Sequence, residues 1–516
     1  MRTFENLPCE CIVEILLYFE DNHSTLHKCL FVNRFWCKLV VPILWRRPFR
    51  QWCNSFQRVE KRIESNWNSL CRTYIAALNE VEKEILTPFD KRHDFPQPLF
   101  QYSSYLEKFS FSAISGIIME GWKINDMWIN LFQDETIKRL RRMMTAILQL
   151  VLRTSHLREI EILDYYTTQL PFFYNVLDII PFSSYQLGFS QLRNLTIHCN
   201  SHTYHKGLLS NLSRSCTNLQ RLEYNIEQHI DSETMDALAN IITTQSNLKK
   251  FSLNNCNIVY NQGRLISYLH SQKESLTSLS IYFIDLSIIN LNRIAEYTKL
   301  ETMKICNCHW TIKGSYEMFL RSPIQLKSLT FSKNRFEDNT ILDALIEKAG
   351  KNLLKLCTDK VPEKTMKYLF QFCPNVSKFT LLYQGNCKEF LCYLKGSRIR
   401  QLVIKSHINS DKLLFSLGKH VPSSLEKIFL RCDFTPVYLR NFLHDYSTLS
   451  LNTLETLYIK DRYDHTYGYL QEIKSCIACN LMKTIVLESF IYTDDELDLF
   501  QNIRKKGINL ILQEAV

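Results

Sequence analysis

Two short cysteine groupings come closest to a metal site in this sequence. They are Cys306-x-Cys308-His309 and Cys476-x-x-Cys479. Thiolate and imidazole groups bind Zn²⁺ with tetrahedral geometry, but such a site needs a second pair of ligands at similar spacing. Neither grouping has that second pair, and Cys308 has a structural role in the repeat described below. We therefore expect no metal and no cofactor.

The sequence also lacks the motifs of common catalytic loops. It has no G-x-x-x-x-G-K-[ST] phosphate loop and no H-E-x-x-H helix. The segment Gly188-Phe189-Ser190-Gln191-Leu192 lacks the second glycine of a nucleophile elbow. Since no group of residues supports an enzyme class, we expect a protein without catalytic residues of its own.

Composition indicates a large globular chain. It has 516 residues, 46% of them hydrophobic, with 12 Gly, 13 Pro and a formal net charge of +10, which is typical of folded domains rather than disorder. The densest basic run is Lys138-Arg139-Leu140-Arg141-Arg142. It lies in a helix-like segment, so a solvated helix face is favoured over a nucleic-acid patch.

The cysteine content predicts an intracellular protein. There are 18 Cys and no recognisable secretory signal, which favours reduced thiols in the cytoplasm or nucleus. The apolar stretch from Cys11 to Phe19 is short and is interrupted by Glu14, and no stretch reaches the length of a membrane span. We expect a soluble protein that contacts no membrane.

The elements that could position a functional surface are internal repeats of the pattern Leu-x-x-Leu-x-Leu, with other large apolar residues allowed. From Leu192 onward the repeats begin about every 23 to 29 residues, which is the period of leucine-rich repeats. A weaker match begins at Leu353, where Thr358 takes the last apolar place. The good matches begin at Leu157, Leu192, Leu219, Leu248, Leu276, Leu300, Leu326, Val376, Ile399, Leu425, Leu454 and Met482.

Several repeats also carry Asn or Cys three residues after the last apolar anchor. These residues are Asn200, Cys256, Cys308 and Asn334, whereas Arg462 and His407 occupy that position in other repeats. Backbone groups are left unpaired where the chain leaves its strand, and an inward Asn or Cys can bond to them. Cys216-x-x-Leu219 and Cys373-x-x-Val376 resemble the cysteine-containing repeats that often accompany F-boxes.

Helical segments separate the predicted strands. The clearest has a capping box at Thr493-x-x-Glu496 and a C-terminal Gly507, and another ends at Gly350. A single unit of this kind cannot bury its apolar face alone, so neighbouring units stack. The fold class is therefore α/β: a leucine-rich-repeat solenoid over residues 156–516, with a curved parallel sheet inside and helices outside.

The N-terminal residues predict three short helices. Ile12, Ile15, Leu16 and Phe19 form one apolar stripe behind Pro8. Ser24 is placed to cap a second helix, and a third carries Phe35/Leu39 and Trp36/Val40 at the i, i+4 spacing. A unit of about 40 residues buries little surface, so a partner is the economical source of stability.

The same segment resembles an F-box. The matching residues are Leu7-Pro8, then Leu26-x-x-Cys29-Leu30-x-Val32, then Trp36, and the closing Leu44-Trp45; Asn33-Arg34-Phe35 departs from the family's pattern. The resemblance implies docking to Skp1 and, through it, to a cullin-based (SCF-type) ubiquitin ligase, with a target protein on the repeats. The implied contact residues are Leu7, Pro8, Ile12, Ile15, Leu26, Leu30, Val32, Trp36 and Trp45.

Three alternatives remain open. The helices could be an ordinary cap on the next domain; the protein could be an interaction scaffold that binds Skp1 without a cullin; or the repeats could carry an enzyme or nucleotide regulator. The predicted domains are 1–49 (F-box), 50–155 (helical connector) and 156–516 (repeats). Within the connector, Val59–Trp67 and Ser69–Leu86 look helical, and Thr87–Pro98 looks like a loop. Candidate ligand-facing residues such as Asn194, Thr196, Ser328 and Thr330 show no dominant charge.

Overall fold

The structure is a computed structural model of the chain. It comprises two compact units, Met1–Ser275 and Leu276–Val516, whereas the sequence analysis placed no boundary inside the repeats. It describes residues 7–49, 61–86, 96–114, 118, 134–163, 189–199, 206–226, 232–255, 267–286, 291–294, 296–309, 325–335, 340–359, 361–385, 388–448, 454–460, 466–475, 483–488, 493–505 and 507–513.

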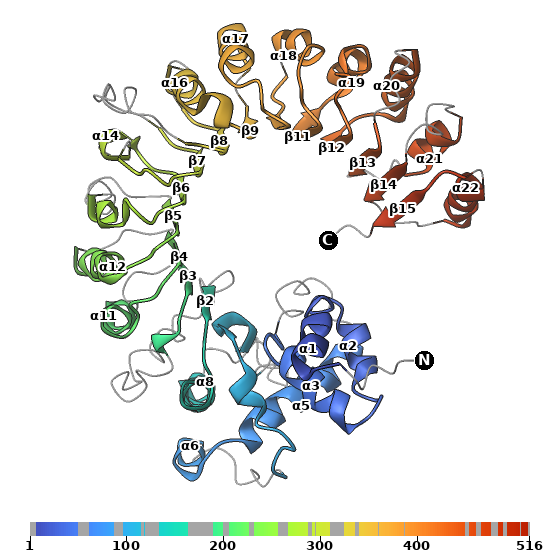
Figure 1. Cartoon of the computed structure of the whole chain (residues 1–516). Coiled ribbons are helices and arrows are strands. Elements are labelled where there is room, and N and C mark those ends of the chain that lie inside the picture. The colour runs from blue at the N-terminus through green and yellow to red at the C-terminus, as the bar shows by residue number, and fades with distance from the viewer. Residues whose placement is uncertain are drawn as a thin grey trace. The chain divides into compact units, whose positions relative to one another are not determined.

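The first unit begins with helices and continues into a parallel sheet (Figure 1). Its strands β1 to β5 pair in chain order, each parallel to the next. The elements are α1 (Cys9–Leu17), α2 (His23–Cys29), α3 (Arg34–Leu44), α5 (Lys61–Ala76), α6 (Glu80–Glu84), η2 (Tyr102–Tyr105), β1 (Lys108–Ser110), α8 (Asp134–Thr154), β2 (Glu159–Leu163), β3 (Asn194–Cys199), α11 (Lys206–Ser215), β4 (Arg221–Ile226), α12 (Ser232–Thr244), β5 (Lys250–Asn255) and η6 (His270–Gln272).

The second unit alternates strand and helix. Strands β6 to β15 are parallel and ordered as in the chain, and the helices lie along one side of them (Figure 1). The elements are β6 (Ser278–Tyr282), α14 (Leu291–Ile294), β7 (Thr302–Cys306), β8 (Ser328–Ser332), α16 (Thr340–Ala349), η8 (Gly350–Asn352), β9 (Lys355–Thr358), α17 (Glu363–Phe372), β10 (Lys378–Leu382), α18 (Lys388–Leu394), β11 (Gln401–Asn409), α19 (Asp411–Leu417), η9 (Gly418–His420), β12 (Lys427–Asp433), α20 (Pro436–Thr448), β13 (Thr456–Lys460), α21 (Thr466–Ser475), β14 (Thr484–Glu488), α22 (Asp494–Lys505) and β15 (Leu510–Gln513).

The predicted repeat starts are the core of both units. Leu192, Leu276 and Leu326 are completely buried, and the weaker start at Leu353 is as deeply buried as the good ones. A strand begins two residues after each start, as at Leu219 and β4. This confirms the α/β fold class with a parallel sheet covered by helices. The last predicted start, Met482, lies outside the described residues.

A shared backbone carbonyl joins successive strand entrances. In the first unit the Arg158 carbonyl accepts hydrogen bonds from the amides of Arg193 and Asn194 at the entrance of β3, both at 2.9 Å. In the second unit the Ser377 carbonyl accepts from Arg400 and Gln401 at 2.8 and 2.9 Å. We call this arrangement the entrance joint. It fixes where each strand begins relative to its neighbour.

The first entrance joint begins in the N-terminal segment. The carbonyl of Arg46, directly after Trp45, accepts from the amides of Glu107 and Lys108 at the entrance of β1. The sheet therefore begins within the predicted connector. Its first repeat starts at Leu106, which was not among the predicted repeat starts. The segment Leu106-x-x-Phe109-x-Phe111 matches the template once Phe is allowed, and all three side chains are buried.

Buried glutamines join neighbouring repeats of the first unit. Gln245 accepts a hydrogen bond from the amide of Leu219 at 2.8 Å and donates to the carbonyl of Cys216 at 2.7 Å. Gln272 does the same one repeat later, accepting from Leu248 and donating to the Gln245 carbonyl. Each side chain satisfies backbone groups that burial would otherwise leave unpaired.

The Asn/Cys position behaves as predicted where it is described. Asn334 accepts from the amide of Cys308 at 2.9 Å and donates to the carbonyl of Ile305 at 2.9 Å. Burial raises the pKa of the Cys308 thiol to about 12, so the thiol is protonated and can donate to the Ile281 carbonyl, 3.7 Å away. His407 is exposed at the end of β11. Asn200, Cys256 and Arg462 lie outside the described residues.

The turn after the strand uses left-handed backbone in three successive repeats. Phe283, Asn307 and Lys333 each have φ of 55°, a region that residues other than glycine rarely adopt. The amide of Phe283 donates to the Cys306 carbonyl, and that of Asn307 donates to the Ser332 carbonyl. At Lys333 the acceptor is instead the carboxylate of Asp359. Hydrogen bonds to the next repeat therefore offset the conformational cost.

The predicted helix ends are confirmed in the second unit. The amide of Thr493 donates to the Glu496 carboxylate, and the amide of Glu496 donates to the Thr493 hydroxyl, which is the capping box expected before α22. Gly507 and Gly350 have φ of +87° and +51°, so each uses the conformational freedom of glycine after a helix.

The connector is only partly helical. The stretch predicted as helix over Ser69–Leu86 is broken, because Asn79 begins α6 with a capping box to Glu82. Glu82 also accepts two hydrogen bonds from Arg153 of α8, both at 3.0 Å, and is almost fully buried. The basic run of residues 138–142 lies within α8, as expected.

The glutamine bridges generate the first prediction. Gln245→Leu removes both bonds and leaves the Leu219 amide and the Cys216 carbonyl buried without that partner. We expect a loss of about 2–4 kcal/mol in the free energy of unfolding of the first unit. Hydrogen exchange measured by mass spectrometry should be faster around Leu219. Gln471→Leu, at an exposed position of α21, is the matched control and should change stability by less than about 0.5 kcal/mol.

The Asn334 bonds generate a parallel prediction for the second unit. Asn334→Leu keeps the volume of the side chain but cannot bond to Cys308 or Ile305. We expect a loss of about 2–4 kcal/mol, measured by urea unfolding, because two backbone groups lose their buried partner. Asn502→Leu on the exposed side of α22 is the control. Equal stability of the two variants would contradict the proposed role of Asn334.

Candidate partner-docking site

Asparagine side chains define the starts of the second and third N-terminal helices. The amide of Thr25 donates to Asn22 at 3.0 Å, so Asn22 rather than Ser24 caps α2, and the prediction for Ser24 is wrong. The amide of Trp36 donates to Asn33 at 2.9 Å at the start of α3. Asn33, which departs from the F-box pattern, therefore has a clear local role.

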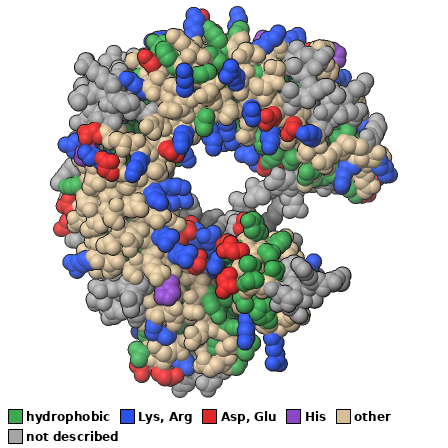
Figure 2. Space-filling view, viewed as in Figure 1, with side chains coloured by type: hydrophobic (Ala, Val, Ile, Leu, Met, Phe, Trp, Pro, Cys, Tyr) green, Lys and Arg blue, Asp and Glu red, His purple; other side chains and the backbone are tan. Residues whose placement is uncertain are grey.

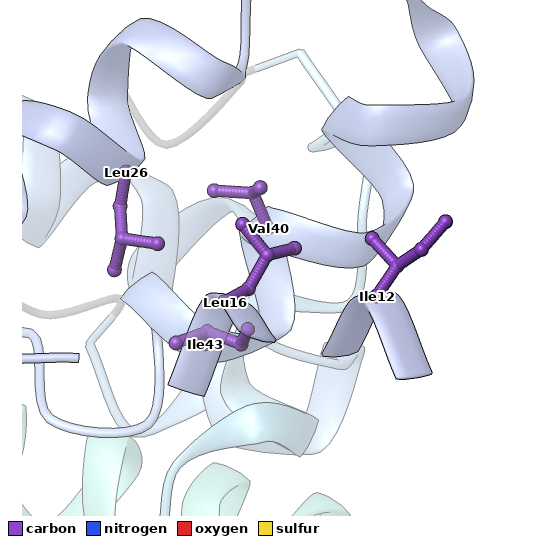
Figure 3. Close-up of a cluster of buried hydrophobic side chains, with 5 residues drawn as sticks. All are labelled: Ile12, Leu16, Leu26, Val40 and Ile43. Atoms are coloured by element: carbon purple, nitrogen blue, oxygen red, sulfur yellow. The ribbon is translucent and has the colours of Figure 1, made fainter. Parts of the chain in front are cut away.

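A small apolar core holds the three helices together. Ile12 and Leu16 of α1, Leu26 of α2, and Val40 and Ile43 of α3 are buried and point toward one another (Figure 3). Leu30, Trp36 and Leu39 pack against this core and are partly buried. Each fully buried side chain of this kind contributes roughly 1.5–3 kcal/mol. The bundle therefore has a core of its own that needs no exposed residue.

Large apolar side chains cover the outside of the same bundle. Tyr18, Phe31 and Val32 are 89%, 77% and 59% exposed, although most large apolar residues of the described chain are buried. Ile15, Tyr18 and Phe19 share one side of α1 and its C-terminal end, since they are spaced i, i+3 and i+4. We call these residues the apolar patch: Leu7, Ile15, Tyr18, Phe19, Phe31, Val32 and Phe35.

Figure 2 shows hydrophobic side chains, in green, gathered over the part of the molecule that holds α1 to α3. A group of large exposed apolar side chains is typical of an interaction site. The predicted stripe of α1 is divided by this patch, because Ile12 and Leu16 are buried whereas Ile15 and Phe19 remain exposed.

The structure separates the nine residues predicted to contact Skp1 into three groups. Leu7, Pro8, Ile15 and Val32 are exposed. Ile12, Leu26, Leu30 and Trp36 belong to the core or pack against it. Trp45 packs elsewhere, as described below. Tyr18, Phe19, Phe31 and Phe35 were not among the nine, although large apolar side chains in or directly after such short helices were a usable signal.

Trp45 attaches the bundle to the connector. Its ring lies 4.1 Å from the ring of Tyr102 and 5.9 Å from that of Tyr74, between centroids. Phe49 contacts Tyr74 as well, at 5.8 Å. Trp45, which closes the predicted F-box, therefore packs against the connector, and the next residue, Arg46, bonds to the entrance of β1. Trp45 is therefore poorly placed to be a primary contact of a partner.

The cysteine groupings show no sign of metal chemistry in the described part of the chain. Cys306 and Cys308 are buried, and burial raises the pKa of both thiols, which disfavours the thiolate that binds metal. His309 is exposed, with Nε2 3.8 Å from Asp285. No group of three potential metal ligands occurs among the described residues, and Cys476-x-x-Cys479 lies outside them.

No helix in the described ranges is both long enough and apolar enough to cross a bilayer.

Comparisons with known proteins add one likeness of structure. No model of a known protein family matches the chain, and no curated protein sequence matches it. The solved structures include a similar one, the leucine-rich repeat-containing protein LegL7 from Legionella pneumophila. The likeness covers 67% of this chain and 97% of that one, at 14% identity and a TM-score of 0.33. The repeat architecture of this protein rests on its own strands and buried leucines.

Proposed function

We propose that the protein is the substrate-recognition subunit of an SCF-type (Skp1–cullin–F-box) ubiquitin ligase. Its N-terminal bundle docks Skp1 through the apolar patch, and its repeats bind a target protein. It has no catalytic role and works in the cytoplasm or nucleus. The observation that carries the proposal is the apolar patch on a bundle whose sequence has the spacing of an F-box.

The separation of core from patch supports a docking role over a simple cap. A cap would bury its apolar surface against the rest of the chain, but among the described residues the bundle packs against the connector through the side of Trp45 and Phe49, and its apolar patch is exposed. The patch stays exposed on α1 and the residues beside it, on the turn between α2 and α3, and on Phe35 at the start of α3. A few aromatic anchors of this kind carry most of the binding energy in many interfaces.

In this proposal the repeat scaffold contributes proximity. A target held on the repeats meets the ubiquitin-conjugating enzyme at a high effective concentration, which lowers the entropic barrier to transfer. Within the first unit, the joint between Arg46 and β1 suits this role, because it ties the bundle to the first strand of the sheet.

The patch generates the third prediction. Phe31→Ala combined with Val32→Ala should lower the retention of Skp1 at least about tenfold, since two exposed apolar anchors are lost while the core is untouched. A pull-down of Skp1 by the full chain measures the effect, and circular dichroism checks folding. Val437→Ala with Tyr467→Ala, at positions 53% and 45% exposed in the second unit, is the matched control.

The outcomes separate the alternatives. Failure of the wild-type chain to retain Skp1, or equal retention by the patch variant, removes the docking proposal and leaves the bundle as a cap. Retention of Skp1 without a cullin supports an interaction scaffold instead. Turnover of a nucleotide or other small substrate by the purified chain would point to the enzyme alternative.

A further inference from the structure

The open face of the sheet is unevenly charged in the second unit. Residues two and four of each strand from β6 to β14 are buried beneath the helices, as Ile428 and Leu430 are in β12. Residues one, three and five therefore lie on the opposite, open face. From β6 to β14 these positions hold one carboxylate, Glu488, and seven cations: Lys304, Lys355, Lys378, Lys405, Lys427, Arg431 and Lys460. Asp433, at position seven of β12, adds a second carboxylate to the same face.

This face differs from its counterpart in the first unit. There, Lys108 pairs with Glu159 and Glu161 at 2.9 and 3.1 Å, and Arg221 pairs with Glu223 at 2.7 Å. In the second unit Lys460 pairs with Glu488, whereas Lys378, Lys405 and Lys427 have no carboxylate within 4.0 Å among the described residues. Figure 2 shows Lys and Arg side chains, in blue, on the strand side of this unit.

The acidic residues beside this face are already paired. Glu301, Glu426 and Glu455 precede their strands and pair with Lys327, Arg400 and Lys483. Asp359 accepts hydrogen bonds from the Lys333 amide and the Gln384 side chain. The uncompensated charge is therefore specific to the face itself.

An apolar strip runs between the cations on the last five strands. Val403, Phe429, Tyr458, Val486 and Ile511 are in register on β11 to β15. The rings of Phe429 and Tyr458 lie 5.4 Å apart. Lys427 lies on one side of this strip, and Lys405 and Arg431 lie on the other.

Arg431 carries a hydrogen-bond donor beside the strip that is unpaired among the described residues. Its guanidinium lies 5.3 Å from the centre of the Tyr458 ring. Its buried Nε has no hydrogen-bond partner in the described part of the chain. The neighbouring Glu488 is occupied by Lys460 and by the Tyr458 hydroxyl. A buried donor without an acceptor carries an energetic cost that a bound carboxylate would remove.

We propose that the open face of β10 to β15 binds an extended acidic peptide segment that also carries apolar side chains. The apolar side chains pack on the strip, and the carboxylates pair with Lys378, Lys405, Lys427 and Arg431. Five strands spaced about 4.8 Å apart span about 19 Å, which is the length of about six extended residues. The inference deepens the proposed receptor function, because it gives the target's chemistry.

The strip favours a peptide over a nucleic acid. Stacking of bases needs exposed aromatic faces, but Tyr458 is buried and covered by Arg431, and its hydroxyl is bonded to Glu488. Phe429 is therefore the one ring of the strip that a base could stack on, and the other three residues, Val403, Val486 and Ile511, are branched aliphatic. These surfaces suit side chains such as Leu or Val.

Fluorescence anisotropy with the full chain tests the proposal. The probe is a labelled peptide of four Glu-Glu-Leu repeats, about twice the length needed, compared with Gln-Gln-Leu and Glu-Glu-Ser peptides and with a charge-matched oligothymidine. Lys378→Glu, Lys405→Glu and Lys427→Glu together should weaken binding of the Glu-Glu-Leu peptide at least about tenfold. The control variant, Lys351→Glu, Lys395→Glu and Lys412→Glu, has the same charge change in or beside helical segments and should weaken it less than about twofold.

Phe429→Ala tests the apolar half of the surface. It should weaken the Glu-Glu-Leu peptide severalfold and leave the weaker Glu-Glu-Ser peptide unchanged. Equal binding of the Gln-Gln-Leu peptide, tighter binding of oligothymidine, or equal losses in the two triple variants would overturn the proposal. Skp1 retention is measured on the same preparations, so peptide binding without Skp1 retention rejects the receptor function while keeping this inference.

Discussion

The entrance joint is the constraint on which the rest of the structure depends. One carbonyl accepts two consecutive amides of the next repeat, from Arg46 to Gln220 in the first unit and from Thr277 to Glu426 in the second. Because the joint fixes only the strand entrance, the segment that returns from one strand to the next is free to vary in length. This explains how repeats of unequal length and unequal helix content build a sheet whose strands stay in register.

At other buried turns, side chains of several residue types form hydrogen bonds with backbone groups of a neighbouring repeat. The amide side chains of Gln245 and Asn334 accept hydrogen bonds from backbone amides. The protonated thiol of Cys373 donates to the Ile346 carbonyl at 3.1 Å. Burial raises the pKa of Cys373 to about 12, so the thiol remains a donor at neutral pH. The abundance of cysteine in this chain is thus partly a matter of small buried hydrogen-bond donors rather than of redox or metal chemistry.

The sequence predicted best what depends on local periodicity. Repeat starts, strand positions and the caps at Thr493 and Gly350 follow from residues close together in the chain. The roles of Gln245 and Gln272 did not, because their partners lie a whole repeat away. For the same reason the apolar stripe of α1 could not be divided into core and surface, since the division depends on where α2 and α3 pack. The charge of the open face also depends on the register of the strands, because its Lys and Arg residues are far apart in the sequence.

The joint at Arg46 connects the N-terminal bundle to the first repeats. The Arg46 carbonyl accepts hydrogen bonds from two amides at the entrance of β1, and a carbonyl of the preceding repeat does so for every later strand of the first unit. The Trp45 ring also contacts the rings of Tyr74 and Tyr102. Removing residues 1–49 would strip the edge strand of its first hydrogen-bond acceptor and uncover two aromatic rings. The bundle therefore cannot be exchanged as an independent module. Recombination that moved it from one protein to another would have to move the first strand of the sheet together with it.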